Sequence, residues 1–226
     1  MLKRRYLIAM IITLAFFLVG IFIGSLLTDT RIKSVEESSS NQRMDFESLQ
    51  TQYLFLSFLN QQGNCKAVEE TLNKNILNLI TTQERLENYE KQAKSNYNDF
   101  INLKRSYSLA EIKYWLLLKN TQNICDRDVV TVLYFYDSDA NCPKCRTQGF
   151  ILSYLKKIFN ERLLIFSFDG EFKDEPIIEI IKKSYNITTY PSIVINDDSF
   201  SGLQTNDDVL KEICKGMQEK TGVCLT

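Results

Sequence analysis

The residues best suited to chemistry in this chain are its six cysteines. Two of them form the motif Cys142-Pro143-Lys144-Cys145. The other four are Cys65, Cys125, Cys214 and Cys224. The chain has no histidine, so it cannot by itself build a Ser-His-Asp triad, a Cys-His dyad or a His-ligated metal site. Acid–base chemistry near neutral pH must therefore use a cysteine, a lysine or a carboxylate with a shifted pKa.

The Cys-x-x-Cys motif fits either a redox-active thiol pair or a site that holds metal. It precedes a helical pattern that extends to about Asn160, so we expect Cys142 at a helix N-terminus, where N–H groups and the helix dipole favour a thiolate. Lys144 adds a nearby cation. We expect Cys142 to attack a substrate disulfide, and Cys145, one turn on and less exposed, to resolve the mixed disulfide. The alternative is that the two cysteines are inert or hold a metal. We favour the redox-active pair and predict that the site uses no metal and no cofactor.

The elements around the motif predict a compact α/β domain over residues 127–226. A continuous β-branched and aromatic run before the motif is typical of a buried strand, and further apolar runs predict more strands. The predicted strands cover 129–136, 163–168 and 193–195, with a fourth starting at Phe200. The predicted helices are the one that follows the motif, 174–185 and 206–220.

The motif and a later proline together resemble the thioredoxin superfamily over roughly residues 127–218. The resemblance rests on Cys-Pro-Lys-Cys after a buried strand and on Tyr190-Pro191-Ser192 entering a later strand. It implies that Pro191 is cis, packs against the disulfide and shapes a substrate groove, and that the Tyr190 backbone pairs with the substrate chain. The stretches Phe135-Tyr136 and Tyr190-Pro191-Ser192 most resemble protein disulfide isomerase domains. A proline directly after the first cysteine, here Pro143, more resembles glutaredoxins and bacterial disulfide oxidases.

Two positions depart from the family pattern. Asn141 stands where a tryptophan commonly precedes the first cysteine, and Tyr134 stands where a buried carboxylate often assists proton transfer. Asp137 or Asp139 is the candidate replacement for that carboxylate, from a more exposed position. These departures affect the positions that influence rate and substrate choice in the family.

Residues 45–125 are predicted to be helical. Apolar residues recur at helical spacing in three segments, from Phe46 to Leu59, from Lys66 to Ser95 and from Asn96 to Asn120. One interpretation is a coiled-coil-like arm that binds a partner or spaces the next domain from a membrane. The alternative, which we favour, is an antiparallel hairpin that packs on itself and on the next domain.

The remaining cysteines are expected to form two structural disulfides. If the second and third predicted helices are antiparallel and similar in length, Cys65 and Cys125 return to the same end and can clasp the hairpin base. Cys214 and Cys224 are close in sequence, with Gly222 between them to permit a turn, so a disulfide there would pin the C-terminal tail.

The N-terminal segment predicts a single membrane span. Residues 6–28 are almost wholly apolar and uncharged, which is long enough to cross a bilayer, and the basic residues lie in 1–5. A cleaved signal peptide is the alternative, but its apolar stretch would be shorter. An uncleaved anchor would leave 1–5 in the cytoplasm and place the linker 29–44 and everything after it on the other side, where oxidising conditions permit disulfides.

The charge and the composition of the chain limit the classes of partner that it can bind. The formal net charge is −1, and without the three bases in 1–5 the chain has 24 basic and 28 acidic residues, which argues against nucleic acid. The sequence predicts a membrane-anchored thiol–disulfide oxidoreductase acting on disulfides of exported proteins, with protein thiol or disulfide substrates and a redox partner protein. A redox-inactive adaptor, whose helical arm binds a partner at the membrane, is the second hypothesis. Both directions of the reaction, oxidation and reduction, are compatible with these residues.

Overall fold

The computed structural model divides the chain into two units, residues 1–56 and 57–226. The structure describes residues 10, 13–21, 65–92, 97–122, 125, 127–220 and 222–225. In the first unit, residues 10 and 13–21 are helical and exposed. Within the described part of the chain, no helix combines the length and the apolar character needed to cross a membrane. Most of the predicted anchor lies outside the described residues. The predicted linker and the predicted helix from Phe46 lie entirely outside them.

The second unit begins with an antiparallel helical hairpin. Its helices are α2 (Cys65–Gln92) and α3 (Tyr97–Thr121). Val68 and Leu72 of α2 are buried, and the rings of Tyr89 and Phe100 stack with centroids 6.4 Å apart near the turn. The two helices therefore pack along their length, as the hairpin interpretation of the sequence requires.

A four-stranded mixed sheet follows. β1 (Val130–Tyr136) pairs in parallel with β2 (Leu163–Asp169), and on its other side it pairs antiparallel with β3 (Ser192–Ile195). β4 (Asp198–Ser201) pairs antiparallel with β3, so the strand order is β2-β1-β3-β4. The helices between and after the strands are α4 (Pro143–Phe159), α5 (Pro176–Ser184) and α6 (Asn206–Gly216), with short 3-10 turns at Asn160–Arg162 and Gly222–Cys224.

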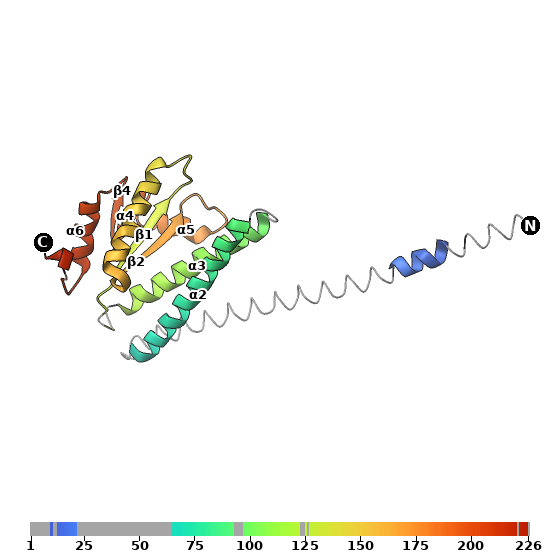
Figure 1. The fold of residues 1–226 in the computed structure, drawn as a ribbon, viewed down its shortest axis with the longest axis horizontal. Helices are drawn as coiled ribbons and strands as arrows, with labels where there is room; N and C mark the ends of the chain where they lie inside the picture. The colour runs from blue at the N-terminus through green and yellow to red at the C-terminus, as the bar shows by residue number, and fades with distance from the viewer. Residues whose placement is uncertain are drawn as a thin grey trace, which may run out of the picture. The chain divides into compact units, whose positions relative to one another are not determined.

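Alternation along the strands supplies a core on each face of the sheet. On one face, Val132 and Tyr134 of β1 pack with Leu155 of α4 and Ile213 of α6. On the other face, the ring of Phe135 lies 5.7 Å from that of Phe168 in β2. Figure 1 shows the sheet with α4 and α6 to one side, and α5 and the hairpin to the other. This mixed α/β arrangement resembles the thioredoxin-like fold, with the order of strands and helices that the sequence predicts.

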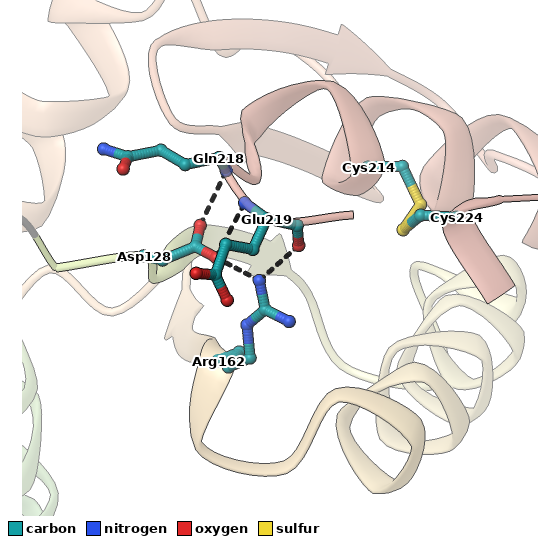
Figure 2. The surroundings of a disulfide bond; sticks show 6 residues. All are labelled: Asp128, Arg162, Cys214, Gln218, Glu219 and Cys224. Atoms are coloured by element: carbon teal, nitrogen blue, oxygen red, sulfur yellow. Dashed lines mark hydrogen bonds and ion pairs between the residues drawn. A yellow bond between two sulfur atoms is a disulfide. The ribbon is translucent and has the colours of Figure 1, made fainter. Parts of the chain in front are cut away.

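Helix α6 ends at Gly216, four residues before the predicted end. The reason is Asp128, whose carboxylate accepts the backbone N–H groups of Gln218 at 2.8 Å and Glu219 at 3.2 Å and also pairs with Arg162 (Figure 2). Burial alone would raise the pKa of Asp128, but those two N–H groups and the Arg162 guanidinium lower it below its ordinary value. The chain is thus held away from the helical path at this point.

The outer edge of β2 is covered by α3 rather than by another strand. Glu111 of α3 is 2% exposed, and its Oε1 accepts the Ser167 backbone N–H at 3.0 Å and the Tyr107 hydroxyl at 3.2 Å. Farther along, the ring of Tyr114 lies 6.1 Å from that of Phe166. Burial raises the pKa of Glu111 to about 8, although both hydrogen bonds act in the opposite direction.

Candidate active site

Cys142 and Cys145 form a disulfide at the start of α4, with their Cα atoms 5.3 Å apart. Cys142 is the N-cap residue and Pro143 opens the helix, where the missing N–H of proline costs nothing. A turn precedes the motif, because the Ser138 carbonyl accepts the Cys142 N–H at 2.8 Å. The helix N-terminus is therefore where the sequence predicts it, directly at the first cysteine.

Both sulfur-bearing residues are buried in this oxidised form. Cys142 is 4% exposed and Cys145 is 3% exposed. The sequence predicts that Cys145 is the less exposed of the two, but the difference between them is very small. Pro143 and Lys144, which lie between them, are exposed. Chemical access to the pair therefore depends on the residues that line this end of the sheet.

Tyr134 contacts the backbone of the motif at the position where the family commonly has a carboxylate. Its hydroxyl donates a 2.6 Å hydrogen bond to the Cys145 carbonyl oxygen. Burial, with a contribution from Asp139, raises the pKa of Tyr134 to about 12. At neutral pH this group is thus a neutral hydrogen-bond donor, and it cannot act as a carboxylate base.

The two aspartates considered as replacements serve the preceding loop. Asp139 is exposed and forms an ion pair with Arg146. The Asp137 carboxylate accepts the Ser138 backbone N–H at 2.6 Å. Both carboxylates therefore have local partners, and these contacts hold the loop rather than bind the cysteines.

Pro191 lies at the same end of the sheet as the motif. The Tyr190–Pro191 peptide bond is cis, as the resemblance implies. Ser192, the next residue, is opposite Phe135 near the end of β1, where the chain leaves the sheet toward Cys142. Pro191 is buried, and its carbonyl oxygen accepts the Gly202 N–H at 2.8 Å. The topology thus brings Tyr190, Pro191 and the motif to one end of the sheet.

Gln148 supports the site and was not predicted from the sequence. It lies one turn after Cys145, is fully buried, and accepts the Gln204 backbone N–H at 2.8 Å through Oε1. Its Nε2 has no hydrogen-bond partner among the described residues. A polar residue on the buried side of an otherwise apolar helix stripe is the signal that would have indicated it.

The other four cysteines are paired as the sequence predicts. Cys65 and Cys125 are joined at the base of the hairpin, with Cα atoms 5.4 Å apart. Cys214 and Cys224 join α6 to the C-terminal tail, also with a Cα separation of 5.4 Å (Figure 2). All six cysteines are thus in disulfides, so none is a thiolate ligand in this form.

No protein-family model and no curated protein matches the chain. Among solved structures, it is similar to a malarial protein at 19% identity and a TM-score of 0.33, over 39% of this chain and 97% of that one. It is also similar to the germline-specific thioredoxin Deadhead from Drosophila melanogaster at 16% identity and a TM-score of 0.33, over 43% of this chain and 92% of that one. For chloroplastic thioredoxin z the identity is 17% and the TM-score 0.33, over 42% of this chain and 84% of that one. Likenesses at these identities concern the fold alone.

Proposed function

We propose that the chain is a membrane-anchored thiol–disulfide oxidoreductase that acts on disulfides of exported proteins. The observation that carries this proposal is the Cys142–Cys145 disulfide at the N-terminus of α4, at the same end of the sheet as Pro191. A helix N-terminus favours the thiolate that disulfide exchange requires. A pair joined across two residues can open and close without a large backbone change.

The reaction needs no group beyond the cysteines and the substrate. In the reducing direction, the Cys142 thiolate attacks a substrate disulfide, forms a mixed disulfide and releases one substrate thiolate. The Cys145 thiolate then attacks the Cys142 sulfur, and the second substrate thiolate leaves. The substrate gains two electrons and the motif becomes the disulfide present in the structure. In the oxidising direction the same steps run backwards, with the substrate dithiol as the electron source.

The proposed location rests on the sequence and on the disulfides. Residues 6–28 supply an apolar segment long enough to anchor the chain, and the bases in 1–5 favour a cytoplasmic N-terminus. Disulfides that clasp the hairpin and the tail fit an oxidising compartment. Resistance to alkaline extraction, together with protease access from the outer side only, tests this part.

The activity is tested on the full chain in detergent with glutathione and a disulfide-bonded peptide. We expect the wild type to exchange disulfides, Cys142→Ser to be inactive, and Cys145→Ser to accumulate the mixed disulfide with Cys142. The matched control is the double variant Cys214→Ser/Cys224→Ser, which removes a disulfide outside the motif and should keep exchanging. A wild-type motif that never cycles would overturn the proposal.

A second candidate function is an adaptor whose hairpin binds a partner. It is favoured by Leu77 and Ile80 on the outer side of α2, which are 65% and 44% exposed. Replacing both with serine distinguishes the two functions, since an adaptor would lose its partner whereas disulfide exchange would be unchanged.

A further inference from the structure

The segment from the last residue of β2 to the start of α5, residues 169–175, holds the side chain of Tyr190 and is called the 169–175 loop below. The Tyr190 hydroxyl donates a 3.0 Å hydrogen bond to Glu171 Oε1. Gly170 lies directly against the ring, because a Cβ atom at that position would collide with the Tyr190 phenol. The phenol is thus held by a carboxylate at its hydroxyl and by close contact with the backbone of Gly170.

Lys182 of α5 completes this contact. Its Nζ donates to the Gly170 carbonyl at 2.7 Å, and lies 5.3 Å from the centroid of the Tyr190 ring. It also pairs with Glu179 at 3.1 Å, and its side chain is only 12% exposed. A mostly buried cation therefore joins the loop to the aromatic ring.

The opposite side of the same loop is held by helix α3. Lys104 pairs with Asp169, and its Nζ lies 4.8 Å from the centroid of the Phe172 ring. Arg105 Nε donates a 2.8 Å bond to Glu175 Oε2, and the Glu175 side chain is only 6% exposed. The loop thus lies between the helical hairpin and the residue that precedes Pro191.

The loop is also bonded to the strand that leads to the cysteines. The Gly170 N–H donates to the Tyr136 carbonyl at 2.8 Å, at the last residue of β1. Tyr136 precedes the loop that enters Cys142 at the start of α4. A displacement of the 169–175 loop would therefore move Tyr190 relative to the end of β1.

We propose that the 169–175 loop positions the Tyr190–Pro191 segment beside the Cys142–Cys145 pair, and that the hairpin, through Lys104 and Arg105, sets how tightly the site binds a polypeptide disulfide. This inference rests on the proposed oxidoreductase function. Three residues have a positioning role in this inference: Tyr190, Glu171 and Arg105. In the described part of the chain, none of their side chains forms a hydrogen bond or an ion pair with the sulfur atoms. A small disulfide such as oxidised glutathione, which makes few backbone contacts, needs this positioning less.

The test compares kcat and KM of the full chain for a disulfide-bonded peptide with the exchange rate for glutathione. Tyr190→Phe removes the donor and Glu171→Ala the acceptor of the hydrogen bond between these two side chains. We therefore expect KM for the peptide to rise about 5-fold in each variant, the effect of roughly 1 kcal/mol, with kcat unchanged. Arg105→Ala should raise KM for the peptide although it lies on a different element. Lys215→Ala is the matched control, because it breaks an exposed ion pair with Glu212 on α6.

A double variant separates positioning from a general loss of stability. If Arg105 acts through Tyr190, Arg105→Ala/Tyr190→Phe has about the KM of Tyr190→Phe alone, because the second change removes nothing further. Additive effects on KM in the double variant, or an unchanged KM in the single variants, would overturn the inference. Glutathione exchange by the wild type would in that case still support the proposed function. Absence of that exchange in the wild type would overturn the proposed function and this inference together.

Discussion

The Tyr134 hydroxyl and the Cys145 carbonyl oxygen are joined by a 2.6 Å hydrogen bond that links β1 to the first turn of α4. The bond is buried. Since the Tyr134 side chain also packs among the apolar residues of this face, the same residue supports both the packing and the orientation of the motif.

Tyr134→Phe is expected to reduce the free energy of unfolding by about 1 kcal/mol, because it removes this bond and leaves the ring in place. The pKa of Tyr134, about 12, keeps the donor protonated at neutral pH. The loss of free energy of unfolding should therefore be the same at pH 6 and at pH 8. Denaturant unfolding measures it. Tyr154→Phe on the exposed side of α4 is the control and should have no effect; an equal loss there would contradict the explanation.

Glu111→Gln is expected to flatten the dependence of stability on pH. The pKa of Glu111 is about 8 in the fold against an ordinary 4.5, so the folded state binds the extra proton between these values. Its contribution to stability is complete below the ordinary pKa and is lost as the pH rises through the raised pKa. Glutamine resembles the protonated acid, so the variant should match the wild type near pH 5 and exceed it at pH 9, by on the order of a few kcal/mol.

Thermal or denaturant unfolding at several pH values tests this difference. Glu87→Gln, an exposed glutamate on α2, is the control. Parallel pH profiles for the wild type and Glu111→Gln would contradict the assignment to Glu111.

Removing the hairpin disulfide should cost more than removing the tail disulfide. Cys65 and Cys125 are 60 positions apart and Cys214 and Cys224 are 10 apart, so loop-closure entropy predicts losses of about 4 and about 3 kcal/mol for the paired serine variants. The free energy of unfolding of each double variant, measured in the same denaturant, checks the order. A larger loss from the tail pair would show that chain entropy does not decide the difference.

Asp128→Ala is expected to release the C-terminal tail. The carboxylate accepts two backbone N–H groups and pairs with Arg162, and charge-assisted bonds of this kind contribute on the order of 2 kcal/mol (Figure 2). Its pKa is lowered, so this stabilisation is complete above the ordinary pKa and is lost as the pH falls through the lowered value. Hydrogen exchange at the Gln218 and Glu219 amides measures the release, with Asp174→Ala as the control on an exposed carboxylate.

The sequence predicts the domain well where the pattern is local. The strand 129–136, the helix after the motif and the pairing of Cys65 with Cys125 depend on apolar period and on helix length, which neighbouring residues determine. The contacts that position the site depend on segments far apart in the chain. Glu111 with Ser167 and Tyr190 with Glu171 join such segments, and no spacing rule connects their sequence positions.

The end of α6 and the environment of Cys142 show the same limit. A helical pattern continues past Gly216, but a carboxylate some ninety positions earlier captures the next backbone N–H groups. The low exposure of Cys142 likewise depends on tertiary packing, whereas its place at a helix N-terminus follows from the local sequence.

Because α3 covers the outer edge of β2, the hairpin also affects how readily the protein aggregates. An uncovered strand edge is a template on which another chain can add a strand. Helix α3 blocks that template, and the Cys65–Cys125 bond keeps α3 tied to its partner helix. We therefore expect strong reducing conditions that loosen the hairpin to expose this edge and to promote self-association through the sheet, so that the disulfide of the hairpin also limits aggregation.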